Sequence, residues 1–163
     1  MSISIYLYKS PFVLGTYTDV NLKNIDISEL GNDELEGLFS SKIYTINPDI
    51  SNWDIKSIPS NFFNNNEQIE EFTIPDSITS IGESAFWKCG DLTSITIPNS
   101  VTIIGRFAFA YCRGLTSVTI PNSVTRIGDR AFEGCDKLTS VTIPKDCDIM
   151  SNSFPSGCKI IIK

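Results

Sequence analysis

Cysteine is the residue type in this sequence best suited to chemistry, and four of its five copies recur at one fixed step. Cys89, Cys112, Cys135 and Cys158 are each 23 residues apart. A structural zinc site needs its thiolates at the corners of a tetrahedron, whereas side chains repeated at one step stack in a line. We therefore expect free, packed thiols that behave as small apolar residues, with a disulfide between adjacent repeats as the alternative.

Other catalytic residue types are missing or scattered. The sequence contains no histidine, which removes the commonest general base, the commonest metal ligand and every Ser-His or Cys-His nucleophile pair. Its carboxylates do not pair at the repeat step, and it has no phosphate-binding glycine loop. We therefore predict that the protein is not an enzyme and that it needs no cofactor and no metal.

The charge and hydropathy of the chain exclude two classes of partner. The net charge of −6 over 163 residues argues against a nucleic-acid partner, which would require a basic stripe. No apolar run is long enough to cross a bilayer, so we expect no membrane insertion. The start of the chain, MSISIYLYKSPFVLG, has no basic residue before its apolar part, and we interpret it as a strand and not a secretion signal. This predicts a cytoplasmic or virion-associated protein.

The cysteines belong to a longer repeat, LTSVTIPNSVTRIGDRAFEGC, that begins at Leu115. Within it, Val118 and Ile120 alternate as a strand does, and Pro121 ends the strand because it has no N–H group. Gly128 is expected to supply a backbone conformation that other residues resist. One unit cannot bury its own apolar residues, but stacked units can. The repeat therefore predicts a β-rich solenoid of 23-residue coils with a short parallel sheet.

Equivalent residues of successive coils should form rows through the solenoid. The clearest row is a spine of Phe86, Phe109 and Phe132. Cys147 falls where earlier repeats have valine, so it should replace an apolar residue, and Phe154 falls in the alanine position, one residue out of step. An earlier unit aligns as well, through Ile58, Phe63 and Ile69. The final KIIIK is expected to form a last strand that caps the solenoid.

The N-terminal third does not repeat. Alternating apolar residues predict strands there, and NDELEGLFSS predicts a short helix. We divide the chain into residues 1–45, a non-repeating α+β cap or a docking module, and residues 46–163, the solenoid with its C-terminal cap strand. Trp53 is assigned to the core of the cap.

The repeat LTSVTIPNSVTRIGDRAFEGC resembles the BspA-like leucine-rich repeats, and the resemblance covers about residues 55–163. It implies a leucine-rich repeat fold. It also implies a surface or secreted protein that binds host proteins, matrix proteins or other cells. A cell-surface location is therefore an alternative to the cytoplasmic or virion-associated one.

Positions that vary between repeats are free to specify a partner. The richest of these positions hold Trp87, Arg106, Phe107, Tyr111 and Arg113, the residue types that are enriched in binding hot spots. The alternative is that these side chains pack locally against the next coil. A second candidate surface is the outward face of the strands, whose rows are Thr73, Thr96, Thr119 and Thr142, and Ser94, Ser117 and Ser140.

Two functions are consistent with these patterns. The first is a non-catalytic protein-binding or adhesion module that acts through the repeat surface on a host, matrix or assembly protein. The second is a structural component of a larger assembly, such as a virus particle, docked through residues 1–45. The sequence does not distinguish between oligomeric states.

Overall fold

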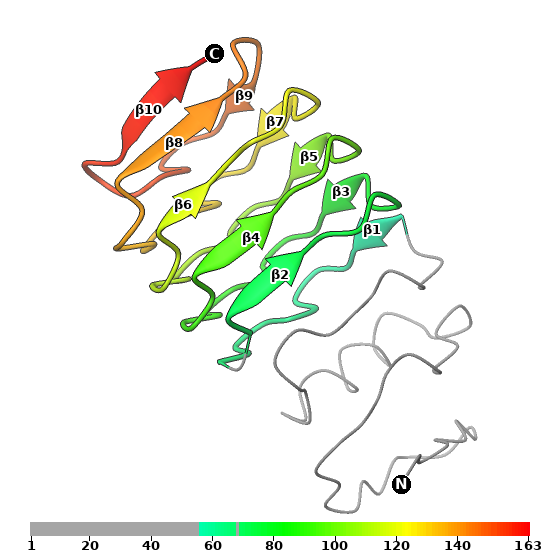
Figure 1. The fold of residues 1–163 in the computed structure, drawn as a ribbon, viewed down its shortest axis with the longest axis vertical. Coiled ribbons are helices and arrows are strands. Elements are labelled where there is room, and N and C mark those ends of the chain that lie inside the picture. The colour runs from blue at the N-terminus through cyan, green and yellow to red at the C-terminus, as the bar shows by residue number, and fades with distance from the viewer. Residues whose placement is uncertain (1–55, 68) are drawn as a thin grey trace, which may run out of the picture.

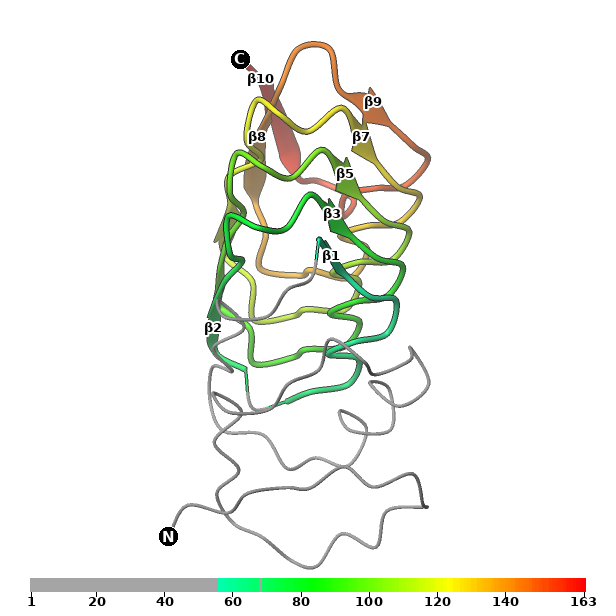
Figure 2. The same cartoon turned by 90° about the vertical axis from the view of Figure 1, so that its right-hand side faces the viewer.

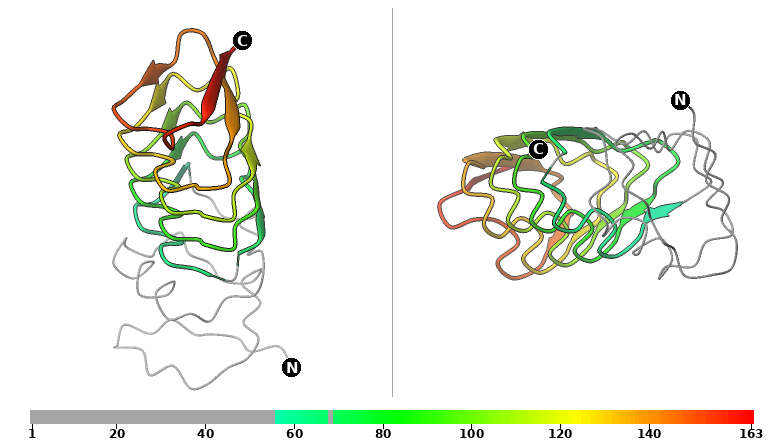
Figure 3. Two further views of the ribbon diagram at one scale, coloured as in Figure 1. Left: turned by 90° about the vertical axis from the view of Figure 1, so that its left-hand side faces the viewer. Right: turned by 90° about the horizontal axis from the view of Figure 1, so that it is seen from below.

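The computed structural model describes residues 56–67 and 69–163, which wind into a stack of coils with parallel strands on two sides (Figure 1). The predictions for residues 1–45 and for Trp53 fall outside the described residues. The views from the other sides show the coils lying one above the other along the whole described part (Figures 2 and 3). The repeat step thus builds a solenoid, as the sequence predicted.

Each coil contributes two strands, whereas the sequence pattern predicted one. The five-stranded parallel sheet consists of β1 (Ser57–Ile58), β3 (Ser80–Ile81), β5 (Ile103–Ile104), β7 (Arg126–Ile127) and β9 (Asp148–Ile149). The second side of the coils holds a three-stranded sheet of β2 (Glu71–Thr73), β4 (Ser94–Thr96) and β6 (Ser117–Val118), followed by a pair of β8 (Ser140–Ile143) and β10 (Lys159–Ile162). A bridge between Thr119 and Thr142 connects these two sheets.

The pairing register is the repeat step itself. Ile58 pairs with Ile81, and Ile81 pairs with Ile104, so residues 23 apart lie side by side. The strand residues Val118 and Ile120 are buried, as predicted. Stacking therefore brings identical side chains together, and the core is a set of uniform rows.

The predicted phenylalanine spine is present and longer than expected. The rings of Phe86, Phe109 and Phe132 are stacked, with 5.1 Å between the centroids of each neighbouring pair. Phe63 extends the spine at one end, with its centroid 4.9 Å from Phe86, and Phe154 extends it at the other, 5.2 Å from Phe132. The rings of Phe63, Phe86, Phe109 and Phe132 are buried, and that of Phe154 is partly buried at the end of the stack.

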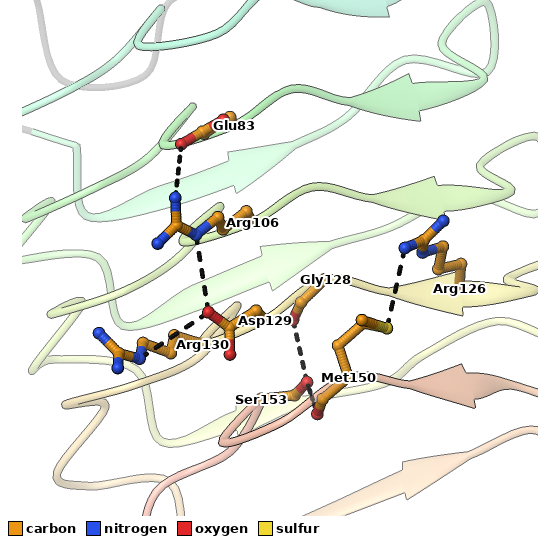
Figure 4. A network of polar contacts seen from close by, with 8 residues as sticks. All are labelled: Glu83, Arg106, Arg126, Gly128, Asp129, Arg130, Met150 and Ser153. Carbon is orange, nitrogen blue, oxygen red and sulfur yellow. Dashed lines mark hydrogen bonds and ion pairs between the residues drawn. The ribbon is translucent and has the colours of Figure 1, made fainter.

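The placement of Phe154 in the alanine position was wrong, because the last coil has a shorter step. Arg126 pairs with Asp148, a step of 22. The carbonyl of Ser153 then accepts the N–H of Phe132, as the carbonyl of Ala131 accepts that of Phe109. The buried Ser153 therefore occupies the alanine position. Its hydroxyl lies 2.9 Å from the carbonyl oxygen of Gly128 and 2.6 Å from that of Met150, either of which accepts its proton (Figure 4).

The role expected for Gly128 is also corrected. It does not have a positive φ angle. Instead, a Cβ atom on Gly128 would lie 2.5 Å from the backbone nitrogen of Arg106, one coil earlier. Gly105 makes the same close approach to the backbone of Gly82. These glycines are required because successive coils touch here backbone to backbone.

Candidate binding surface

The side of the coils between the two sets of strands carries the predicted binding residues. We call it the third side; it consists of residues 59–70 apart from 68, 82–93, 105–116, 128–139 and 150–158. It contains no strand, but its backbone still bonds from coil to coil. For example, the N–H of Phe107 donates to the carbonyl of Asp129 (3.1 Å), and that of Tyr111 donates to Glu133 (2.6 Å). These bonds fix the spacing at which neighbouring side chains meet.

Two rows of left-handed residues direct these N–H groups toward the next coil. One row consists of Asn61, Ser84, Phe107, Arg130 and Asn152, and the other of Asn65, Lys88, Tyr111, Gly134 and Gly157. Glycine and asparagine adopt a positive φ readily, whereas for a bulky residue it is an outlier. Phe107 (φ 53°) and Tyr111 (φ 61°) are the two aromatic members, and both belong to the same coil.

The first group of predicted residues forms what we call the Trp87 cluster, which is Trp87, Lys88, Tyr111 and Gly134. The rings of Trp87 and Tyr111 meet edge to face, with their centroids 6.3 Å apart. The ammonium group of Lys88 lies 4.0 Å from the centre of the Trp87 ring. On its other flank Tyr111 lies over Gly134, where an added Cβ would be 2.6 Å from the ring. The Tyr111 ring is therefore held between two neighbouring coils while remaining half-exposed.

The second group forms the Arg106 cluster, which is Glu83, Arg106, Phe107, Asp129 and Arg130. The guanidinium of Arg106 lies 4.6 Å from the centre of the Phe107 ring, and that of Arg130 lies 5.7 Å from it. Figure 4 shows the charged members in a line across three coils: Arg106 pairs with Glu83 (3.8 Å) and Asp129 (3.6 Å), and Arg130 pairs with Asp129 (3.8 Å). Such long, exposed pairs contribute little stability, but they orient both guanidinium groups around one half-exposed ring.

The structure thus places the five predicted residues in two clusters and one separate pair. Trp87 contacts Tyr111, and Arg106 contacts Phe107. Arg113 pairs instead with Asp136 (3.6 Å). Within the part of the chain that the structure describes, no ring contact or ion pair joins these three groups to one another.

Sequence reasoning did not identify several members of these clusters. Lys88, Asp129 and Arg130 were missed because charged residues at corners are usually solvated. The signal that could have found the left-handed rows is the type of residue in the other coils, where the same positions hold Asn61, Asn65 and glycine. Asparagine and glycine recurring at a fixed step indicate a positive φ for the whole row.

The outward rows on the strands form a plainer surface. Most members of the predicted threonine and serine rows are exposed, with Thr142 intermediate. A separate threonine ladder, which the sequence did not predict, runs beside the five-stranded sheet: the Thr102 hydroxyl donates to the Thr79 carbonyl (3.1 Å), and Thr125 donates to Thr102 (3.2 Å). The threonine hydroxyls of this ladder form hydrogen bonds between neighbouring coils. Such small side chains offer a partner little surface to contact.

The cysteines are free in the structure, and three of them form a buried row. The thiols of Cys89, Cys112 and Cys135 donate to the carbonyls of Phe63, Phe86 and Phe109 at 3.0–3.1 Å. Burial raises the pKa of Cys135 from 9.0 to about 12 and raises that of Cys112 well above its usual value. A thiol with such a pKa stays protonated at neutral pH and is a poor nucleophile.

The predicted fourth member of the row is displaced. Cys158 is only partly buried, because β10 begins at the next residue and pairs with β8 at a step of 19. In contrast, the backbone N–H of Cys147 donates to the carbonyl of Pro144, as the N–H of Val124 donates to that of Pro121. Cys147 therefore lies at its predicted position. Burial also raises the pKa of both thiols, and the charge of Asp148 adds to the effect at Cys147.

Two further properties concern only the described residues. They contain no group of three or more His, Cys, Asp or Glu side chains that could hold a metal ion. No helix among them has the length and apolar character needed to cross a membrane.

Comparison with known proteins identifies the repeat. The family model described as a BspA type leucine-rich repeat region matches residues 35–162 in six copies. A leucine-rich repeat protein from Bacteroides ovatus is 30% identical, with a TM-score of 0.65, and the match covers 73% of this chain and 33% of that one. No curated protein matches the chain.

Two other solved structures are similar. A leucine-rich cell surface protein from Faecalibacterium prausnitzii is 29% identical with a TM-score of 0.60, covering 67% of this chain and 30% of that one. A leucine-rich repeat protein of T. pallidum, at 23% identity and a TM-score of 0.64, supports the fold alone; the match covers 71% and 56%. The chain spans between about a third and a half of the length of these proteins.

Proposed function

This chain belongs to the BspA type leucine-rich repeat family, and we propose on that premise that it is a non-catalytic protein-binding module that acts through its third side. Its contact residues would be those of the Trp87 cluster and the Arg106 cluster. Family membership supports a protein–protein interaction in general, whereas the choice of surface rests on the geometry of these residues.

The observation that carries the proposal is the left-handed backbone of Phe107 and Tyr111. The same positions in other coils hold serine, asparagine, lysine, arginine or glycine, so the fold does not require an aromatic residue there. An L-residue in this conformation costs about 1–2 kcal/mol unless it is glycine or a short polar residue. Strained residues of this kind cluster at functional sites, where the strain serves binding.

The surroundings of the rings also suit a binding hot spot. Trp, Tyr and Arg dominate such sites because a large, rigid side chain desolvates well. Here Lys88 and Gly134 hold the Trp87 and Tyr111 rings in place before a partner arrives. Pre-ordered side chains lose less entropy on binding, which raises affinity.

For the partner we propose a class of protein and not an individual protein. The similar F. prausnitzii protein is described as a cell surface protein, which supports a host or matrix protein as the partner of this chain. The matches cover only about a third of the B. ovatus and F. prausnitzii proteins. Any activity of a whole protein that contains such coils is therefore also part of the proposal. The assembly function docked through residues 1–45 stays a prediction, since those residues lie outside the described part.

The test uses substitutions that other coils already carry at these positions. Trp87→Ala copies Ala110, and Tyr111→Asn copies Asn65. We expect the double variant to lose at least tenfold in affinity for a partner captured from the native source, with its thermal unfolding nearly unchanged. Affinity is measured by surface plasmon resonance with the purified partner.

The matched control is Ile103→Thr, which removes an exposed apolar side chain from the five-stranded sheet instead. It should bind as the wild-type chain does. If the double variant keeps full affinity and a native melting temperature, the Trp87 cluster is not the contact surface. If it loses several degrees of stability, the rings are packing residues.

A further inference from the structure

The outward face of the five-stranded sheet carries an apolar side chain that the fold does not need. Ile103 is 45% exposed, although its strand β5 is paired on one side with β3 and on the other with β7. Its exposure therefore does not depend on a free sheet edge. The register partners of Ile103 are Ser80 on β3 and Arg126 on β7. Because polar residues occupy the same outward position in the neighbouring coils, stacking does not require an isoleucine here.

Arg126, one coil after Ile103, has a guanidinium group without an ionic partner. Within residues 56–67 and 69–163 it forms no ion pair, although Asp148 is its register partner on β9. Its Nη2 atom lies instead 3.8 Å from the sulfur atom of Met150 (Figure 4). The contact holds the guanidinium beside a polarisable, uncharged group, so its charge is available to another molecule.

Met150 also departs from the residue type of its row. Its N–H donates to the carbonyl of Ile127 (3.0 Å), as the N–H of Gly128 donates to that of Ile104 (2.8 Å). Met150 therefore takes the position that glycine holds in the three preceding coils, at residues 82, 105 and 128. Two positions that are polar or glycine elsewhere thus carry apolar side chains, one coil before Arg126 and one coil after it.

The chemistry of these residues indicates what would bind to them. We call Ile103, Arg126, Asp148 and Met150 the Ile103 patch. A guanidinium group is attracted to the electron-rich face of an aromatic ring, and a methionine sulfur contacts rings favourably. The exposed carboxylate of Asp148 can accept a hydrogen bond from a phenol O–H or an indole N–H. An acidic ligand fits less well, because Asp148 would repel it.

We propose that the Ile103 patch binds a tyrosine or tryptophan side chain that a partner protein presents to the five-stranded sheet. The ring lies across Arg126, between Ile103 and Met150, and its O–H or N–H group donates to Asp148. Apolar patches with a polar surround are typical of protein contacts. None of the four residues belongs to the Trp87 cluster or the Arg106 cluster. A partner bound to those clusters does not require the patch, so the two proposals stand or fall independently.

The probe is N-acetyl-tyrosinamide, titrated into the full chain at millimolar concentrations and followed by methyl NMR. A ring docked on the patch should shift the methyl signals of Ile103 and Met150 upfield, and the shifts should saturate. Ile161 is the internal reference, because it is about as exposed (42%) but lies outside the patch. N-acetyl-phenylalaninamide should bind more weakly, since it cannot donate to Asp148, and N-acetyl-leucinamide should not displace the tyrosine probe.

The variants use a residue that the sheet already carries. Arg126→Ser copies Ser80 and should weaken the binding of N-acetyl-tyrosinamide about threefold, because the cation is lost. Arg113→Ser is the matched control, since it removes the same charge from an exposed arginine on the third side and should leave the affinity unchanged. If Arg126→Ser does not fold, Ile103→Ser, which also copies Ser80, keeps the test decisive and should reduce the shift of Met150.

Four results would overturn the proposal. They are the absence of a saturable shift at Ile103, an equal shift at Ile161, displacement of the probe by N-acetyl-leucinamide, and unchanged affinity in the folded variants. A wild-type dimer in light scattering that Ile103→Ser dissociates would also overturn it, because a second copy would then cover the patch.

Discussion

The interior and the third side of this solenoid follow the same repeat step, but they differ in which residues they accept. The interior spine has a phenylalanine in every described coil, from Phe63 to Phe154. Two residues before the phenylalanine of each middle coil, on the third side, the same step gives Ser84, Phe107 and Arg130. In the interior the stacking of identical shapes fixes the side chain, whereas on the third side only the backbone conformation is fixed.

This difference indicates which positions can vary in residue type to suit a partner. A residue that must match its neighbours above and below cannot vary without loss of packing. A residue in either left-handed row of the third side needs only to tolerate that backbone conformation, and its side chain is otherwise free. Substitutions in the interior should therefore cost more stability than substitutions in the left-handed rows of the third side.

The largest effect is expected at the centre of the spine. Phe109→Ala removes a fully buried ring that stacks on Phe86 and Phe132. The free energy of unfolding should fall by about 3–5 kcal/mol, the usual cost for a buried aromatic. Urea unfolding followed by circular dichroism measures the change, and a loss below 1 kcal/mol would show that the spine does not carry the core.

The contact between coils at the glycine row should give the next largest effect. Gly128→Ala places a Cβ atom 2.5 Å from the backbone of Arg106, so the two coils must move apart. We expect a loss of about 1–3 kcal/mol, as for other overpacked sites. Gly90→Ala is the control, because no atom lies within 4 Å of its added Cβ. Equal effects of the two substitutions would contradict the close approach.

The buried thiols predict a pH dependence of stability. Burial raises the pKa of Cys135 from 9.0 to about 12, so the thiol ionises in the unfolded chain at a lower pH than in the folded one. The unfolded state then binds fewer protons, and stability falls as the pH rises from about 9 to 12, by about 1.4 kcal/mol per pH unit. The stability difference between the wild type and Cys135→Ala should shrink over this range. A difference that stays constant with pH would contradict the burial of this thiol.

The smallest effect on stability is expected on the third side. Gly134→Asn keeps a residue that tolerates a positive φ, but its Cβ displaces the Tyr111 ring (2.6 Å). We expect the free energy of unfolding to change by less than about 1 kcal/mol while the emission of Trp87 changes, because its neighbour moves. Fluorescence of the Trp53→Phe background isolates Trp87. An unchanged spectrum would mean that Tyr111 does not rest on Gly134.

Much of the interior could be predicted from the sequence because equivalent core residues recur every 23 residues. The spacing of Phe86, Phe109 and Phe132 was enough to identify the spine. The step failed in the last coil, where it falls to 22 at β9 and 19 at β10, and Phe154 and Cys158 were misplaced for that reason. Residue counting cannot locate a deletion when two alignments place apolar residues equally well.

The third side was less predictable for a different reason. Residue types indicated the Trp87 and Arg106 positions as candidates, but not their division into two clusters. That division depends on which neighbours share a coil-to-coil contact, such as Tyr111 with Gly134 and Arg130 with Phe107. The second strand of each coil was missed because a two-residue strand such as Arg126–Ile127 has no period to detect.

We propose that the fold does not need the rings of Phe107 and Tyr111 and that these two rings serve binding. The most direct test of this proposal is the thermal unfolding of the double variant Phe107→Asn, Tyr111→Asn, in which both positions carry the residue found at the corresponding positions of the first described coil, Asn61 and Asn65. Relief of the left-handed strain offsets the lost ring contacts, so the account predicts a melting temperature equal to or above that of the wild type. A fall of more than about 4 °C, equivalent to more than about 1 kcal/mol, would contradict the account and make these rings part of the core.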